Sequence, residues 1–353
     1  FLLGQLLFGR VTSKHRGDIL EHPLLQSYGP LDGWHILLAI GVISIGFFTY
    51  QVQKATRLVM LGSSDDRFDS WGTRVSEFLS GWLFQKKVLR DKVAGTMHVL
   101  MFWGFLMLAS DMLDLATANS FSGKVLPAIL VGPWNGMVEL GYFMALIGCV
   151  SALTRRVVFT PEKLKGKSQL EGNVILLLIF TITTTSFMVE SAESPSSFWE
   201  PLGYWFSEIG LSEQTVILSY WAHMLAISVF LFLIPLSKHM HLVMAVPNVF
   251  FHDAGPKARM RPLATGDDGK AVPLEDLDID SFGVSSYNQY SWRQLIDGWS
   301  CTSCARCQDV CPAYASGKGL NPMQVIHDVR NYANDHAPIL LAGGQPDETM
   351  LER

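Results

Sequence analysis

Charged residues are scarce in this chain of 353 residues. Lysine, arginine, aspartate and glutamate make up 17% of it, the mean hydropathy is +0.24, and the formal net charge is −5 at pH 7. An ordinary soluble domain has about 25% charged residues, and a nucleic-acid-binding domain usually carries a basic surplus. Long apolar runs fill the first 245 residues instead. We therefore expect a protein of the lipid bilayer that binds no nucleic acid.

Cysteine is also rare, with five in the chain, and four of the five lie close together. Cys301, Cys304, Cys307 and Cys311 form a C-x2-C-x2-C-x3-C-P run, which is the bacterial ferredoxin spacing for a [4Fe–4S] cluster. Two-residue gaps let three thiolates on one turning loop reach three corners of a cubane. A structural zinc site favours two separated C-x2-C pairs, and disulfides require an oxidising compartment, so both alternatives are weaker. The run predicts a protein that moves single electrons.

A second cysteine run is absent from these residues. The fourth cysteine of such a run typically ligates a different cluster, which is held together with a second run. The chain also begins with Phe1 rather than with methionine. We expect it to be part of a longer chain, with the partner motif of Cys311 beyond Arg353 or on another subunit.

The apolar runs predict an all-α membrane protein. Five stretches approach the roughly 20 residues that a bilayer requires, and they lie at 34–52, 94–117, 133–154, 173–190 and 214–237. We expect four regions: an N-terminal interfacial segment at 1–33, a five-helix membrane domain at 34–247, a linker at 248–290, and a small α-helical ferredoxin-like cluster domain at 291–353. In the cluster domain, Asn321 and Pro322 predict the start of a helix, because asparagine caps helices and proline suits the first helical position.

Loop charges predict the orientation of the spans. The connection between the first two spans carries eight lysines and arginines, whereas residues 190–213 carry five glutamates and no lysine or arginine. Basic loops remain in the cytoplasm, so the glutamate-rich loop faces outward. Five spans then leave the cysteine run inside, where a reducing compartment suits clusters. We expect a multi-pass protein of the inner cell membrane with a cytoplasmic iron–sulfur domain.

Three histidines in or near the spans predict haem ligation. His98 lies near the cytoplasmic end of the second span, and His223 and His241 are 18 residues apart on the fifth. Eighteen residues are five helical turns, so His223 and His241 share one helix face. The second and fifth spans are antiparallel, which brings His98 to the depth of His241 and predicts bis-histidine ligation of a b-type haem. A structural role is the alternative for each histidine, and His239, His252, His327 and His336 are expected at the interface or the surface.

A second group of ionisable side chains lies in the outer third of the predicted bundle. It comprises His223, Asp111, Glu139 and His35. Such groups are costly inside a membrane and often mark proton paths. Quinone reduction consumes two protons with two electrons, so these residues are candidates for a quinone site. The alternative, of equal weight for Asp111 and Glu139, is that they cap or hydrogen-bond to neighbouring helices.

Residues 34–247 resemble the cytochrome b (gamma) subunit of respiratory nitrate reductases. That family holds two haems with two histidines on the second span and two on the fifth. His98 matches the first of these, His223 and His241 match the fifth-span pair, and Pro235 to His241 matches the family's P-x2-K-x2-H stretch. Leu108 stands where the remaining histidine belongs. The resemblance implies one haem b on His98 and His241, and a second only if His35 or another ligand replaces the missing partner.

Residues 291–353 resemble the cluster segment of heterodisulfide-reductase-type iron–sulfur proteins. The combination of the two modules resembles bacterial electron-transfer flavoprotein:menaquinone oxidoreductases. This resemblance implies electron transfer from reduced electron-transfer flavoprotein, through [4Fe–4S] clusters and haem b, to menaquinone, with further subunits as potential partners. One alternative is a menaquinol-oxidising subunit that feeds a heterodisulfide or sulfur-compound reductase. Another is a non-catalytic membrane scaffold with a cytoplasmic zinc knob.

Overall fold

A computed structural model describes residues 11–12, 19–20, 23, 26–116, 128–159, 167–192, 196–255, 272–277, 284 and 286–346. Side chains are described in all of these except 11–12, 19–20, 111–116, 128, 167–168 and 274. The chain gathers into two compact units: Phe1–Phe48 with Gln85–Leu233, and Thr49–Phe84 with Ile234–Arg353. Each unit is described by itself.

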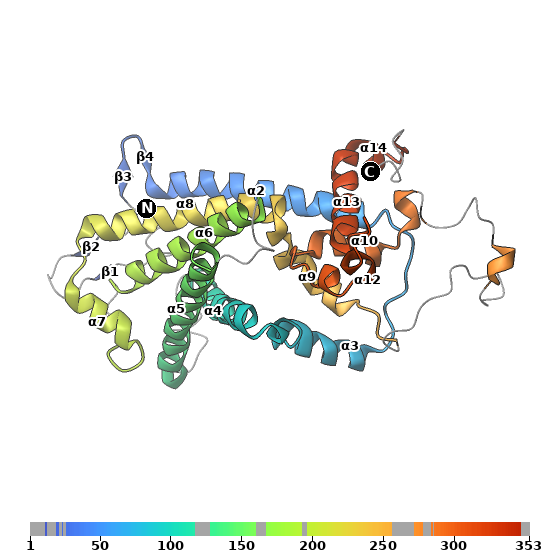
Figure 1. The fold of residues 1–353 in the computed structure, drawn as a ribbon. Coiled ribbons are helices and arrows are strands. Elements are labelled where there is room, and N and C mark those ends of the chain that lie inside the picture. The colour runs from blue at the N-terminus through green and yellow to red at the C-terminus, as the bar shows by residue number, and fades with distance from the viewer. Residues whose placement is uncertain are drawn as a thin grey trace. The chain divides into compact units, whose positions relative to one another are not determined.

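The first unit is built mainly from long helices (Figure 1). Two short antiparallel pairs precede them, β1 (Val11–Thr12) with β2 (Ile19–Leu20) and β3 (Ser27–Tyr28) with β4 (Leu31–Asp32). The helical elements are the first part of α2 (Gly33–Val59), the short η2 (Val88–Arg90), α4 (Lys92–Ala116), α5 (Ala128–Val157), α6 (Lys167–Glu190), α7 (Pro201–Ile209) and α8 (Glu213–Leu236). The first part of α2 lies beside α8, with the rings of Phe47 and Phe232 4.7 Å apart.

Glycines allow α4 and α5 to cross closely. A Cβ built on Gly104 would lie 2.7 Å from the backbone nitrogen of Ala145, and one on Gly148 would lie 2.8 Å from the carbonyl oxygen of Met97. Small residues permit such backbone contact between membrane helices. Next to this crossing, Cys149 is buried, and its thiol donates to the Leu176 carbonyl of α6 at 3.0 Å.

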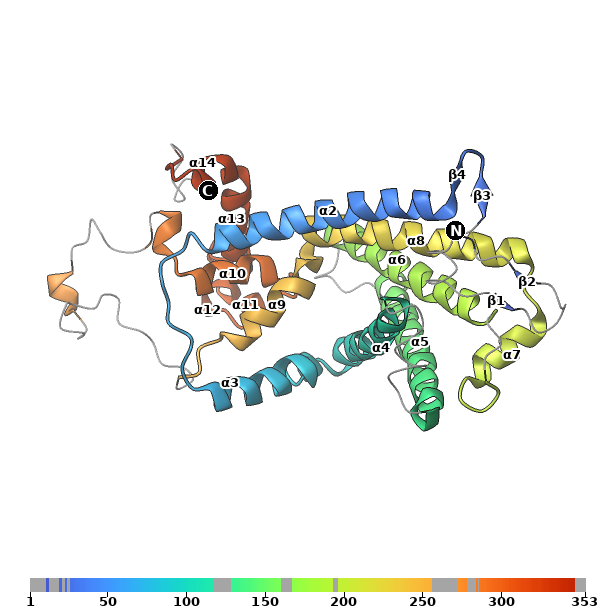
Figure 2. The same ribbon diagram turned by 180° about the vertical axis from the view of Figure 1, so that it is seen from behind.

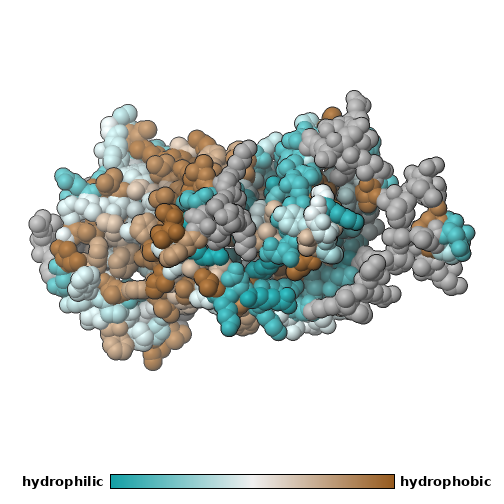
Figure 3. All heavy atoms as spheres, viewed as in Figure 1, coloured by the Kyte–Doolittle hydropathy of each residue, from teal (hydrophilic) through white to brown (hydrophobic). Residues whose placement is uncertain are grey.

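Among the described residues, five helices are long and apolar enough to cross a membrane: Gly33–Val59, Lys92–Ser110, Ile129–Val157, Gln169–Glu190 and Glu213–Leu236. The five predicted spans and the all-α membrane class are thereby confirmed at this level. Many large apolar side chains on these helices are exposed, for example Val42, Leu170 and Leu218. Figure 3 shows hydrophobic residues gathered over the long helices on this face of the molecule. Exposed apolar faces on long helices are what lipid requires.

The second unit contains the rest of α2 and the elements around the cysteines (Figure 2). Its first elements are α3 (Trp71–Phe78), the π-helical turn Leu79–Leu83, the 3-10 turn Lys238–Met240 and α9 (His241–Phe250). The later ones are the 3-10 turns Leu274–Asp276 and Tyr287–Gln289, α10 (Trp292–Ser300), α11 (Arg306–Asp309), α12 (Pro312–Ala315), α13 (Pro322–Asp335) and α14 (Ala337–Leu341).

The core of the second unit joins residues far apart in sequence. Leu58 of α2, Met244 of α9 and Leu295 of α10 are buried together with Tyr332 of α13. The hydroxyl of the buried Tyr287 donates to the Leu58 carbonyl at 3.1 Å. Gly62 permits a close backbone contact, because a Cβ there would lie 2.6 Å from the Trp292 nitrogen. The end of α2 and the helices around the cysteines therefore form one body.

Candidate functional site

Helix α10 leads directly into the cysteine run. It begins with a capping box, in which the Ser291 hydroxyl accepts from the Gln294 nitrogen and the Gln294 side chain accepts from the Ser291 nitrogen. Leu295, Ile296 and Trp299 are buried on its inner face. The helix ends at Ser300, and Cys301 follows in an extended conformation. A capped and packed helix thus fixes the position of the first cysteine.

The loop after Cys301 has an unusual backbone. Ser303 (φ 55°) and Ala305 (φ 60°) both adopt the left-handed conformation, which costs a residue other than glycine about 1–2 kcal/mol. Left-handed residues next to right-handed ones turn successive N–H groups toward one side, and such nests hold anionic groups that include iron–sulfur clusters. Cys307 then lies in α11, and Cys311 precedes Pro312 at the first position of α12. The backbone around the four cysteines fits a bound anionic cluster.

The thiols of this loop influence one another. All four are free, with Cys301 and Cys311 half-buried and Cys304 and Cys307 exposed. Burial raises the pKa of Cys301, and the neighbouring Cys304 and Cys307 raise this pKa further. Cys304 and Cys307 therefore lie close enough to Cys301 to affect its ionisation. Within the described residues, no three His, Cys, Asp or Glu side chains converge as the ligands of a single ion do, whereas a cubane is held at separate corners.

His327 faces the cysteine loop, although the sequence suggested a surface position. It lies on α13, its Nε2 is 3.3 Å from the Ser303 hydroxyl, and the residue is half-buried. Burial lowers the pKa of His327, and the nearby Arg330 lowers it further. A lone histidine in a polar helix gives no sequence signal for such a contact.

His241 does not continue the helix of His223, contrary to the prediction that both share one helix face: α8 ends at Leu236, Ser237 is extended, and a 3-10 turn precedes His241 at the start of α9. One ring nitrogen of His241 is already engaged. Its Nδ1 lies 2.8 Å from the Lys238 carbonyl. A carbonyl only accepts hydrogen bonds, so Nδ1 carries the proton and Nε2 keeps its lone pair. Burial lowers the pKa of His241, which favours this neutral form. A backbone-oriented imidazole with a free Nε2 is the usual form of a metal-ligating histidine.

Helices α9 and α10 are fastened together, which brings His241 and the cysteine loop into one body. The Ser300 hydroxyl, directly before Cys301, donates to the Met244 carbonyl at 3.0 Å. Met244 lies three residues after His241, about 4.5 Å along the helix axis. The Asn248 amide donates to Asp297 at 2.6 Å. Arg293 donates to Asp297 at 2.9 Å, to Asn248 at 3.3 Å and to the Phe251 carbonyl at 3.0 Å.

His98 and His223 both belong to the first unit. His98 lies on α4 with its ring nearly parallel to that of Phe102, at 6.5 Å between centroids. His223 lies on α8, where its Nδ1 is 3.0 Å from the Ile182 carbonyl and 3.3 Å from the Thr185 hydroxyl. As in His241, the nitrogen next to a carbonyl carries the proton, so Nδ1 of His223 is the donor and Nε2 is left as the acceptor. Because His98 and His241 lie in different units, their pairing around a haem stays a prediction.

The other predicted site residues have local partners. His35 accepts at Nδ1 from the Asp32 nitrogen at 3.2 Å and stacks on Trp34. Asp111 lies near the end of α4, and its side chain falls outside the described part of the chain. Glu139 accepts from the backbone nitrogens of Leu202 at 2.8 Å and Gly203 at 2.7 Å. Its carboxylate therefore caps the start of α7, where a negative charge is favourable.

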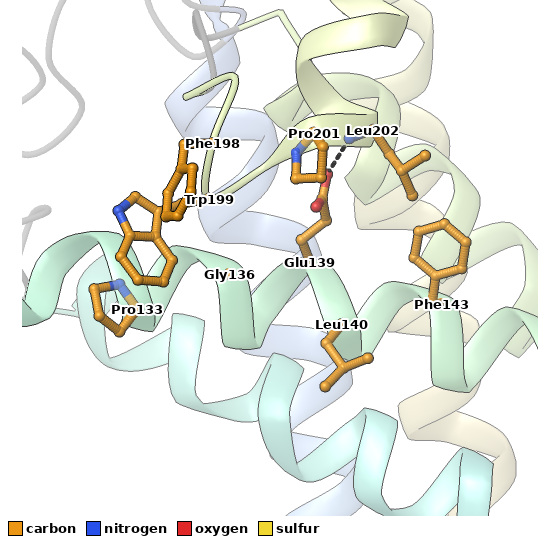
Figure 4. A pocket seen from close by; sticks show the side chains of 9 residues that line it. All are labelled: Pro133, Gly136, Glu139, Leu140, Phe143, Phe198, Trp199, Pro201 and Leu202. Atoms are coloured by element: carbon orange, nitrogen blue, oxygen red, sulfur yellow. Dashed lines mark hydrogen bonds between the residues drawn. The ribbon is translucent and has the colours of Figure 1, made fainter.

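Glu139 also lines a cavity of about 440 Å³ between α5, the Phe198–Trp199 segment and the start of α7 (Figure 4). The other lining residues are apolar or glycine: Pro133, Gly136, Leu140, Phe143, Phe198, Trp199, Pro201 and Leu202. Cavities of this size with few polar groups are typical small-molecule sites. The sequence did not indicate the part played by Trp199, which packs over Gly132 and Gly136.

The apolar helices and the cysteine loop define the class of protein. They describe a membrane-associated iron–sulfur protein. Comparison with known proteins supports this class. No family model matches the chain, and no solved structure matches it.

The chain is similar to the EtfAB:quinone oxidoreductase of Syntrophomonas wolfei subsp. wolfei, with 27% identity over 87% of this chain and 44% of the relative. It is similar to the probable iron-sulfur-binding oxidoreductase FadF of Bacillus subtilis, with 26% identity over 85% of this chain and 43% of that protein. The chain is also similar to a probable membrane-anchored ferredoxin of Chromohalobacter salexigens, with 37% identity over 18% of this chain and 10% of that protein. The chain spans less than half the length of the first two relatives. The resemblance to electron-transfer flavoprotein:quinone oxidoreductases is confirmed.

Proposed function

We propose that this chain conducts electrons from reduced electron-transfer flavoprotein in the cytoplasm to menaquinone in the inner cell membrane. Cys301, Cys304 and Cys307 would hold one [4Fe–4S] cluster, and Cys311 would serve a second. His98 and His241 would hold haem b. When bound, the cluster and the haem supply reversible one-electron chemistry.

The contact between α9 and α10 carries this proposal. Cys301 follows Ser300, and Ser300 donates to Met244 one turn beyond His241. The chain therefore connects its candidate cluster ligand to its candidate haem ligand through one hydrogen bond and short stretches of backbone. The network of Asn248, Asp297 and Arg293 keeps the two helices in register. A protein that relays single electrons needs such a fixed spacing between its redox centres.

The chain's own residues have four further tasks in this function. The left-handed turns at Ser303 and Ala305 would turn backbone N–H groups toward a cluster held by the cysteines. The Lys238 carbonyl fixes the tautomer of His241. His223, Asp111, Glu139 and His35 are the candidates for binding menaquinone and moving its protons on the outer side. Residues 291–353 would receive the flavoprotein.

The direction of electron flow is tested by anaerobic haem absorbance in the purified protein. Reduced electron-transfer flavoprotein is added to one sample and menaquinol to another. Reduction of the haem by the flavoprotein, together with reoxidation by menaquinone, is the expected result. Haem reduction by menaquinol alone would reject the proposed direction in favour of a menaquinol-oxidising subunit that feeds a reductase. A protein without haem and acid-labile sulfide would point to a zinc-bearing scaffold.

A further inference from the structure

The walls of the cavity beside Glu139 are held in place from several sides. Trp199 packs against α5 where Gly132 and Gly136 leave room, because a Cβ on either glycine would meet its ring or backbone. The Glu200 carboxylate accepts from the Asn135 amide at 3.1 Å and from the Ser196 nitrogen at 3.2 Å. The hydrogen bonds from the Leu202 and Gly203 nitrogens to Glu139 hold the start of α7 against this side of the cavity. The cavity is therefore preformed, as ligand sites usually are.

Exposed apolar side chains lie at the edge of the cavity. Leu140 and Phe143 line it, and they are 51% and 38% exposed on a helix that is apolar enough to span a membrane. Figure 4 shows Phe143 and Trp199 at opposite ends of the cavity with Glu139 between them. Aromatic and aliphatic walls suit a flat apolar ring. A ligand would enter from the bilayer rather than from water.

One polar group interrupts these apolar walls. Glu139 is 9% exposed, and its Oε1 takes both backbone hydrogen bonds. Within the described residues, no hydrogen bond reaches its other oxygen, Oε2. A carboxylate oxygen on an apolar wall that accepts no hydrogen bond from the protein is open to a donor on a ligand. A hydroxyl donor on the ligand would satisfy it.

We infer that this cavity binds the ring of a membrane-dissolved prenylated quinol, with a ring hydroxyl donating to Oε2 of Glu139. The inference rests on the proposed function. It reduces the set of candidate quinone-site residues, because Glu139 lines the cavity, whereas His35 and His223 do not. A carboxylate accepts from the hydroxyl of a quinol but has no proton for the carbonyl of a quinone. The site therefore binds the reduced form more tightly than the oxidised form.

The location is tested with a photoreactive menaquinol analogue on the holoprotein in lipid nanodiscs, read by mass spectrometry of the labelled peptides. Labelling is expected in α5 and in residues 196–203. Leu140→Trp fills the cavity mouth and should reduce labelling at least tenfold. The matched control is Ile147→Trp, two turns further along α5, 52% exposed and outside the cavity, which should keep labelling within twofold.

Three results would overturn the inference: labels confined to other helices, an equal loss in both tryptophan variants, or protection of the cavity by phospholipid alone. If the label falls elsewhere while menaquinone still reoxidises the haem, the inference fails and the proposed function stands. If neither labelling nor haem reoxidation occurs, both fail.

The chemistry is tested with Glu139→Gln and, as control, the exposed Glu213→Gln. The glutamine keeps an oxygen for the start of α7 but adds an amide donor for a quinone carbonyl. Competition between quinol and quinone for the photolabel should favour quinol about tenfold in the wild type and in Glu213→Gln, since hydrogen bonds to charged groups are the stronger ones. Glu139→Gln should lose this preference. An unchanged preference would contradict the role of Glu139.

Discussion

Replacement of Arg293 by methionine should loosen α10 from α9. Methionine keeps much of the apolar stem but removes the hydrogen bonds to Phe251, Asn248 and Asp297. The arginine side chain is 15% exposed, whereas Asp297 is 46% exposed, so the ion pair adds only about 0.3–0.5 kcal/mol. The two bonds to neutral oxygens contribute about 1 kcal/mol each. The expected loss is roughly 2–3 kcal/mol for the local opening of α10.

Hydrogen exchange measures this loss directly. If α10 opens locally, its amides should exchange about 30- to 160-fold faster in Arg293→Met than in the wild type. The control is Lys318→Met, an exposed position outside the α9–α10 contact, which should leave exchange in α10 unchanged. Exchange that rises less than threefold in Arg293→Met would refute the view that this network fastens the two helices.

Three further substitutions test the remaining assignments. Cys304→Ala should abolish the electron paramagnetic resonance signal of the cluster and keep the haem absorbance, and an unchanged cluster signal would contradict the ligand assignment. His98→Ala should abolish the haem absorbance and keep the cluster signal, and a haem that survives would exclude His98 as its ligand. Gly104→Val should lower thermal stability by about 1–3 kcal/mol through overpacking at the α4–α5 crossing. Gly46→Val should leave thermal stability unchanged, because nothing lies within 4 Å of a Cβ at this position. Equal losses of stability in the two valine variants would disprove the close crossing.

Local sequence signals predicted the elements well. Hydropathy located the five long helices, because a lipid-facing helix must be apolar along its length. Asn321 and Pro322 predicted the start of α13, and the Asn321 side chain accepts from the Met323 nitrogen at 3.0 Å and from the Gln324 nitrogen at 3.3 Å. Caps and hydropathy are read from neighbouring residues, so they are visible in sequence.

Contacts between distant residues were not visible. Ser300 meets Met244 across 56 positions, and Leu202 meets Glu139 across 63. Tyr287 falls in the range predicted as a linker, yet it is buried under the end of α2. Such contacts depend on how helices pack, which leaves no periodic pattern in the chain. The same holds for the contact of His327 with the cysteine loop.

The cysteine run illustrates both what could be predicted from the sequence and what could not. Their spacing predicted a cluster, because ligand spacing is a property of one short loop. The left-handed turns at Ser303 and Ala305 were not predicted, since neither residue type favours that conformation. The ligand roles of the four cysteines and of His98 and His241 stay predictions.

The most direct measurement follows the cluster and the haem in time after rapid anaerobic mixing with reduced electron-transfer flavoprotein. Freeze-quench paramagnetic resonance would report the cluster, and stopped-flow absorbance would report the haem. The account predicts that the cluster is reduced first, that the haem follows, and that Cys304→Ala abolishes haem reduction while keeping the haem. Haem reduction at the wild-type rate in Cys304→Ala would contradict the path from the cysteine loop through α10 and α9 to His241.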